Sequence, residues 1–170
     1  MGRSDLQDAF DHHVWANEQV LDALTALDDG QLASPVPGTY GSMLDTMRHI
    51  VGADDWYLYV LTGGVRDMIE EDTMSLADLR PVVREHGRAW SALLAEGRDP
   101  DEVVIAQRKD GTEGHAPLGI RLAQVVHHGT DHRSQICTGL TALGVEPPYI
   151  DVWAFGETEG RVFDTPAASG

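Results

Sequence analysis

The sequence predicts an all-α protein, a four-helix bundle with a short hairpin or extended excursion before the last long helix. Apolar residues recur at spacings of three and four in four long segments, residues 4–28, 42–62, 75–94 and 118–143. Such spacing places the apolar side chains on one face of each helix. Four amphipathic helices can bury these faces against one another, which is the arrangement of a bundle.

Turn-forming and capping residues separate the first two helices. The helix over residues 4–28 ends at Asp28-Asp29-Gly30, and the segment 34–38, with two prolines and a glycine, is expected to be a loop. The second helix, over residues 42–62, begins at Ser42, a good N-cap residue, and is followed by two glycines. These signals predict a short loop leading into the second helix.

The third helix, over residues 75–94, has two possible starting points. Ser75 and Asp78 resemble a capping box, in which a serine and an acidic residue three positions later satisfy free backbone N–H groups. Pro81 lies near the second turn and has no backbone N–H to donate. The regular helix is therefore expected to begin either at Ser75 or at Pro81.

The fourth helix follows an extended segment. Residues 103–105 are β-branched, and residues 109–112 are typical of a turn, which predicts the hairpin or extended excursion. In the helix over residues 118–143, steps of three and four place His132 among the core-facing positions, with His128 beside them. Both histidines are therefore expected on the core side of this helix.

One domain accounts for residues 1–164. The chain contains no internal repeat or low-complexity segment, and its 170 residues suit a single core. Residues 150–155 are expected to form a short terminal helix, and residues 165–170 a flexible tail.

Composition narrows the class of protein and its location. The formal charge of −16, from 28 acidic and 12 basic residues, would repel nucleic acids and anionic membranes. The beginning of the chain lacks the pattern of a signal peptide, and no apolar run is long enough to span a bilayer. We therefore expect a soluble cytoplasmic protein. The single cysteine, Cys137, excludes an internal disulfide and is expected to be a small buried side chain.

His128 and His132 are the strongest chemical signal in the sequence. Their spacing of four places both imidazoles on one face of a helix, where they can bind one divalent cation such as zinc, nickel or iron. Two ligands do not complete a coordination sphere. His49, beside the apolar stripe of the second helix, is the best candidate for a third ligand, because bundles build metal sites from inward side chains of facing helices.

Alternative interpretations of these and other residues remain open. A spacing of four can arise by chance among eight histidines, and a histidine beside a core is often only hydrogen-bonded. His86 can be a fourth ligand or, as we favour, a core histidine. Asp45 can orient an imidazole or reach back to the start of its helix. Surface positions are expected for His115, His127 and Asp131. The absence of HExxH, GxSxG, GxGxxG and P-loop motifs argues against the enzyme classes that they mark.

The order of several motifs resembles the DinB/YfiT-like superfamily over nearly the whole chain. The segments that carry this resemblance are Trp15-Ala16-Asn17, Met47-Arg48-His49-Ile50 with Trp56, residues 128–136, residues 143–148 and Asp151. The resemblance implies a four-helix bundle, commonly dimeric, with a divalent metal such as zinc or nickel, or alternatively iron or manganese, held by His49, His128 and His132. Ser134 and Asp131 stand where glycine and a further histidine are common, which leaves the three ligands unchanged.

Characterised relatives in that superfamily include transferases and isomerases that use the thiols mycothiol or bacillithiol. The resemblance therefore implies a metalloenzyme that transfers a low-molecular-weight thiol to an electrophilic small-molecule substrate, acting as a homodimer. Three neutral imidazoles leave the double charge of the ion intact, so a thiol or water that binds it loses a proton more readily. A metal-dependent hydrolase and a non-catalytic metal-binding stress-response dimer are the alternatives, and no further residue is assigned a catalytic role.

Overall fold

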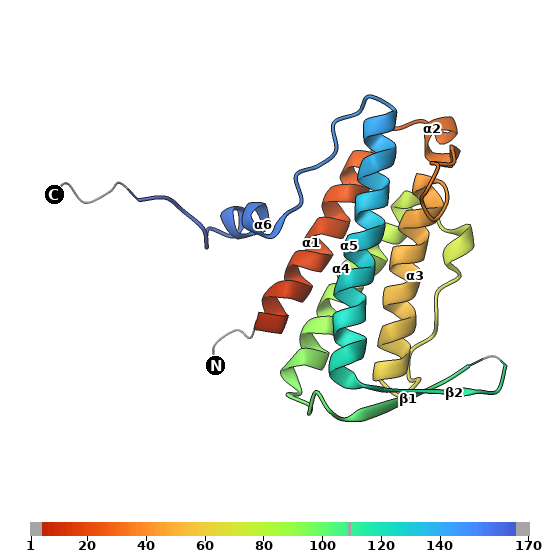
Figure 1. Cartoon of the computed structure of the whole chain (residues 1–170), viewed down its shortest axis with the longest axis vertical. Coiled ribbons are helices and arrows are strands. Elements are labelled where there is room, and N and C mark those ends of the chain that lie inside the picture. Colours follow the sequence, from red (N-terminus) through yellow and green to blue (C-terminus); the bar gives the residue numbers. More distant parts are fainter. Residues whose placement is uncertain (1–4, 109, 166–170) are drawn as a thin grey trace.

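The computed structural model describes residues 5–108 and 110–165, which are mostly helical. Four long helices lie side by side (Figure 1). They are α1 (Asp5–Thr25), α3 (Met43–Leu61), α4 (Leu76–Ala95) and α5 (Leu118–Ala142). The short elements are α2 (Asp29–Ala33), the 3-10 helix η1 (Glu71–Thr73) and α6 (Val152–Thr158). The expected tail lies, except for its first residue, outside the described residues, as does position 109 of the expected turn.

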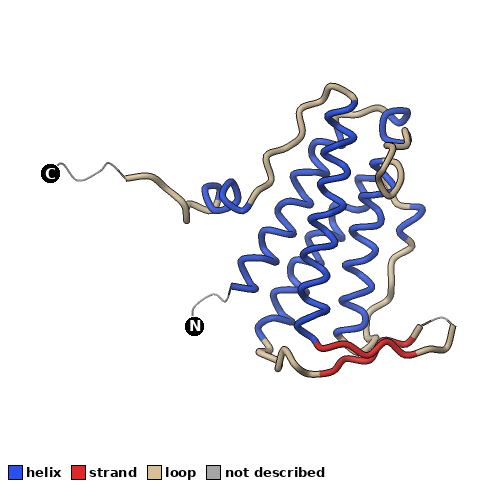
Figure 2. Tube along the Cα trace, in the orientation of Figure 1, coloured by secondary structure: helices blue, strands red, loops and turns tan. Residues whose placement is uncertain are grey.

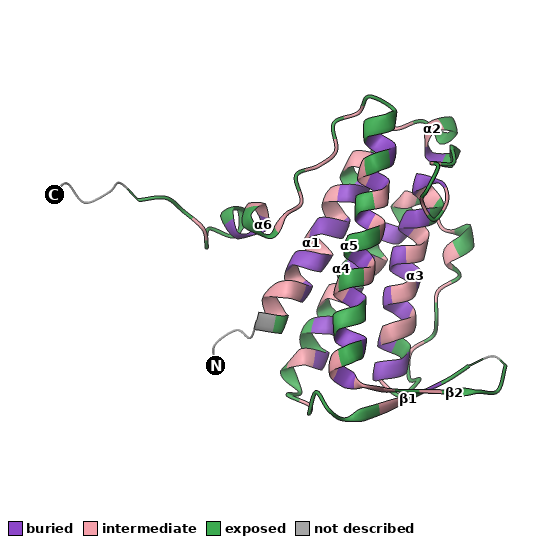
Figure 3. Cartoon of the chain, in the orientation of Figure 1, coloured by how far each residue is buried: buried purple, intermediate pink, exposed green. Residues whose placement is uncertain are grey.

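Each long helix packs against two neighbours. Helix α1 lies against α4 and α5, and α3 lies against the same two helices from the other side. The buried residues line the inward faces of these helices (Figure 3). Met47, Ile50 and Leu140 belong to one buried apolar cluster, and Phe10 and Trp90 belong to a second. The predicted apolar stripes therefore become a shared core.

The excursion before the last long helix is a β-hairpin, which is one of the two alternatives predicted from the sequence. Strands β1 (Val103–Gln107) and β2 (Glu113–Pro117) pair antiparallel, with Ile105 opposite His115. The hairpin lies at one end of the long helices (Figure 2). It passes directly into α5, where the Leu118 N–H donates a hydrogen bond of 2.8 Å to the carbonyl of Glu102.

Capping residues explain where three helices begin or end. The first helix ends at Thr25 instead of residue 28, because Asp28 caps the unexpected helix α2 by accepting the Gln31 N–H at 2.9 Å. The capping box of Ser75 is confirmed, so α4 begins at Leu76. Pro81 lies inside α4, at the cost of one backbone hydrogen bond.

The core-facing side of α5 differs from the prediction at one step. Gly129, Arg133 and Ile136 are buried, whereas His132 is only half-buried. The expectation that His132 points into the core was wrong, because the arginine one position later takes the buried place and hydrogen-bonds there. His132 consequently faces the boundary between the core and the surface.

The terminal helix α6 begins at Val152, two residues later than expected. Its N-cap is Asp151, whose carboxylate accepts the Ala154 N–H at 2.8 Å. Phe155 packs against the α1 residue Trp15, with ring centroids 5.7 Å apart. Over the part of the chain that the structure describes, no helix is both long and apolar enough to cross a membrane.

Candidate metal centre

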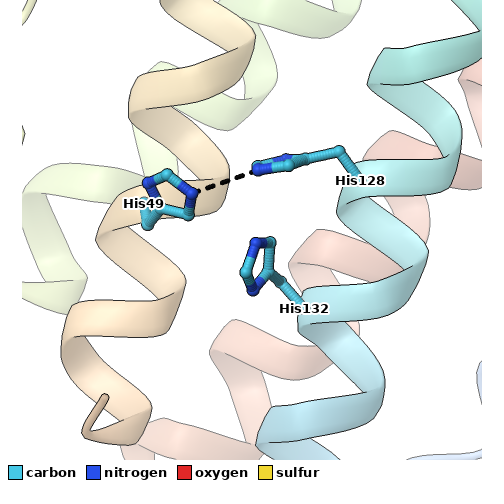
Figure 4. Close-up of side chains that lie close together, drawn as sticks. All are labelled: His49, His128 and His132. Carbon is cyan, nitrogen blue, oxygen red and sulfur yellow. Dashed lines mark hydrogen bonds between the residues drawn. The ribbon is translucent and has the colours of Figure 1, made fainter. Parts of the chain in front are cut away.

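Three histidines converge between α3 and α5. His49 comes from α3, and His128 and His132 come from successive turns of α5 (Figure 4). One ligand nitrogen of each lies within 4.8 Å of the others. The Nε2 atoms of His49 and His128 are 3.1 Å apart, and neighbouring ring centroids are 4.4–4.9 Å apart. The structure therefore brings together all three residues that the sequence and the resemblance selected.

Local helix geometry aims these side chains at one another. On α3, Met47, Ile50 and Val51 are buried in the core, so His49 lies at the edge of the apolar stripe. On α5 the buried Gly129 lies beside His128 and allows close approach of α1. Packing of α3 against α5 then leaves the three rings half-buried in the seam between these helices.

The surroundings keep two of the histidines neutral. Burial, followed by the neighbouring histidines His132 and His49, lowers the pKa of His128 from 6.5 to about 4. Burial and the proximity of His132 also lower the pKa of His49. Neutral imidazole offers a nitrogen lone pair to a metal, whereas the protonated ring does not. Near neutral pH these residues are therefore in the form that binds a cation.

The spacing suits a divalent ion. Two nitrogens bound to zinc at about 2.0–2.1 Å with tetrahedral geometry lie roughly 3.3 Å apart. The separation of 3.1 Å between His49 Nε2 and His128 Nε2 is close to that value. Because imidazole suits zinc, nickel, copper and iron, the donor set fits a borderline divalent metal better than calcium or magnesium, which prefer oxygen ligands.

The loop before α3 contributes an aromatic side chain to the centre. The ring of Tyr40 stacks on His49, with centroids 4.0 Å apart and planes at 8°, and it meets the edge of His132. A polar cavity of about 480 Å³ adjoins Tyr40 and His49. Its other lining residues are Gly41, Asp45, Arg48, Glu71 and Asp72. The carboxylate of Glu71 occupies the space that a Cβ at Gly52 would fill.

A buried polar network lies on the α1 side of α5. His13 contacts Asp54 through Nε2 at 2.7 Å and the Arg133 guanidinium through Nδ1 at 3.0 Å. Arg133 also donates to the amide oxygen of Asn17 at 2.9 Å. None of these four side chains was predicted from the sequence to belong to a functional site. The spacing of four between His13 and Asn17 on an amphipathic helix was the available signal, but their partners are distant in sequence.

The remaining candidates adopt the simpler of their expected roles. His86 is a core histidine, buried and 3.1 Å from the carboxylate of Asp55. Asp45 reaches back to Ser42, whose hydroxyl donates to it at 2.6 Å. His115, His127 and Asp131 are exposed. Burial raises the pKa of the Cys137 thiol, which disfavours the reactive thiolate.

Packed long helices with three converging imidazoles define the class of this protein, a helical protein with a candidate three-histidine metal centre. The model of the DinB family matches residues 1–164. The chain belongs to the DinB family, which confirms the resemblance inferred from its motifs. A search of curated proteins found no match.

Proposed function

We propose that this protein holds a divalent metal ion through His49, His128 and His132 and is an enzyme that transfers a low-molecular-weight thiol to an electrophilic substrate. The observation that carries the metal proposal is the convergence of three ligand nitrogens within 4.8 Å of one another. Family membership supports the same conclusion. Zinc or nickel is the expected ion, with iron or manganese as alternatives.

The protein's own residues favour a reactive centre over a closed structural site. Three histidines leave at least one position of a tetrahedral ion for another ligand, as in catalytic zinc sites. When bound, such an ion would act as a Lewis acid that makes a thiol or water beside it more acidic. The neighbouring polar cavity gives a substrate access to His49. These features support an enzyme, and the family resemblance favours the thiol as nucleophile.

One wall of that cavity carries a group suited to proton transfer. Burial, followed by the charges of Asp72 and Asp55, raises the pKa of Glu71. Its carboxyl therefore keeps a proton at higher pH than an ordinary glutamate and can exchange it nearer neutrality. Glu71 lines the same cavity as His49. We include it as the first acid–base candidate to vary once a substrate is found.

The proposal extends to the arrangement of the long helices and to the oligomeric state. We infer that α1, α3, α4 and α5 form a four-helix bundle, because each lies against two of the others around a shared core. The homodimer implied by the family resemblance remains a prediction, which light scattering on the purified protein would test.

Metal analysis with histidine variants tests the metal site. We expect the purified protein to bind one Zn²⁺ or Ni²⁺ per chain, and His49→Ala and His132→Ala to lose most of this binding, because two imidazoles hold an ion poorly. His127→Ala and His115→Ala are matched controls, since both side chains are exposed. Isothermal titration and elemental analysis give the affinity and stoichiometry. Stoichiometric metal retained by both His49→Ala and His132→Ala would refute the assignment.

Assays with and without thiol distinguish the possible activities. The proposed transferase requires turnover of an electrophile, such as an epoxide or activated alkene, only when both metal and thiol are present. Cleavage that needs metal and water but no thiol would favour the hydrolase. Metal binding that raises the melting temperature, without turnover of any compound in the panel, would favour the non-catalytic metal-binding dimer.

A further inference from the structure

The side chain of Gln135 connects one metal-ligand candidate to the loop before α3. Its Oε1 atom lies 3.1 Å from Nδ1 of His132, three positions earlier on α5. The same oxygen accepts the backbone N–H of Tyr40 at 2.8 Å. Gln135 is half-buried; its contact with His132 is partly shielded from water, whereas its contact with the Tyr40 N–H is exposed. One oxygen atom therefore meets two groups from different parts of the chain.

The hydrogen bond from the Tyr40 N–H determines which ring nitrogen of His132 carries the proton. A backbone N–H can only donate, so the glutamine atom facing it must be the carbonyl oxygen and not the amide nitrogen. That oxygen can only accept. The neutral ring of His132 must then carry its proton on Nδ1 to make the second hydrogen bond. Its Nε2 atom consequently has a free lone pair.

Tyr40 also contacts His49, a second of the three candidate metal ligands. While its backbone bonds Gln135, its ring lies flat on His49, 4.0 Å between centroids. Thr39 folds this loop locally, because its hydroxyl donates to the carbonyls of Val36 and Gly41 at 2.7 and 3.0 Å. A single loop residue thus constrains ligand candidates on both α3 and α5.

We propose that Gln135 is a positioning residue that holds His132 in the Nδ1–H tautomer, with Tyr40 fixing the orientation of the glutamine amide. The inference rests on the proposed metal site, where it explains how Nε2 of His132 is kept available for a divalent cation. Hydrogen-bond acceptors behind metal-binding histidines commonly act in this way, by fixing the tautomer and the ring orientation.

The first experiment measures the tautomer without metal. Long-range ¹H–¹⁵N spectra of the metal-free protein, recorded well above the ordinary imidazole pKa, report which ring nitrogen of His132 carries the proton. We expect Nδ1–H in the wild type and in Gln135→Glu, which keeps an acceptor, but a mixture or Nε2–H in Gln135→Leu. Gln124→Leu, an exposed position on the same helix, is the matched control. Nδ1–H retained in Gln135→Leu would overturn the inference.

The second experiment measures Zn²⁺ affinity in the same variants. We expect Gln135→Leu to weaken binding about 10–100-fold and Gln135→Glu to restore it to at least the wild-type level, since a carboxylate acceptor makes the ligand more basic. A general loss of structure would not be reversed by the glutamate. If the wild type itself binds no metal, the proposed function fails while the tautomer result still stands. Equal affinity of wild type and Gln135→Leu overturns the role of Gln135 in metal binding.

Discussion

At the scale of single residues, two glycines beside the candidate centre hold space for specific neighbours. A Cβ at Gly129 would collide with the imidazole of His13, and one at Gly52 would collide with the carboxylate of Glu71. The two collisions differ in how easily they are relieved. His13 is fully buried and held by Asp54, whereas the carboxylate of Glu71 is the end of a flexible, half-buried side chain. Gly129 is therefore required for packing, and Gly52 provides room for a movable carboxylate.

Alanine substitutions at these two glycines should change the free energy of unfolding by different amounts. We expect Gly129→Ala to lower the free energy of unfolding by about 1–3 kcal/mol, because the buried ring of His13 must leave its hydrogen bonds. Gly52→Ala should change it by less than about 1 kcal/mol, since Glu71 can turn outward and alanine favours a helix over glycine. Urea denaturation of both variants measures the difference. Equal destabilisation would contradict this account of the two sites.

At the scale of elements, the segment between α3 and α4 is fastened at two points. The buried Asp55 of α3 accepts the Ile69 N–H at 2.9 Å, and Arg48 donates to the carbonyl of Met74 at 2.8 Å. Burial alone raises the pKa of Asp55, but hydrogen bonds from His86 and Ile69 outweigh it and lower that pKa. These anchors hold η1, with Glu71, against α3 at the wall of the cavity.

Removal of the Asp55 carboxylate should release this segment. We expect Asp55→Ala to lower the free energy of unfolding by about 2–4 kcal/mol, because the buried His86 and the Ile69 N–H lose their acceptor. Hydrogen exchange at the Ile69 amide should become faster than in the wild type. Asp72→Ala, exposed on the same segment, is the control and should leave both quantities nearly unchanged. Unaltered exchange at Ile69 in Asp55→Ala would exclude the anchoring role.

At the scale of the whole molecule, protonation of the candidate centre is coupled to folding. The pKa of His128 is about 4 in the folded protein, compared with 6.5 ordinarily. Between these values the unfolded chain binds more protons than the folded one, so this group makes stability rise with pH through that window. The excess of acidic residues has the opposite tendency, because lowering the pH reduces their mutual repulsion.

The metal-free protein should therefore lose the contribution of His128 on acidification. We expect this contribution to be present above pH 6.5 and to be lost progressively as the pH falls toward about 4. Comparison of wild type and His128→Gln cancels most of the carboxylate effects. The urea concentration at the unfolding midpoint should depend less steeply on pH in His128→Gln than in the wild type. Parallel curves for the two proteins would contradict the lowered pKa.

Much of the local structure could be predicted from the sequence alone. Spacings of three and four, together with Ser42 and Ser75, indicated the long helices and where two of them begin, because periodicity and capping act within a few residues. The spacing of His128 and His132 was equally local. His49 was selected from its place beside an apolar stripe and from the family resemblance, and the structure brings it to the other two.

Other features depended on the tertiary structure. The contact of His13 with Asp54 spans 41 positions, and that of Tyr40 with Gln135 spans 95. No short-range pattern encodes such pairs, since they form only after side-chain packing sets the rotation of each helix about its axis. That rotation buried Arg133 instead of His132 and left the histidine at the seam. The sequence by itself determined which residues could form the centre, whereas helix packing decided how they face one another, because metal-site geometry depends on contacts between distant elements.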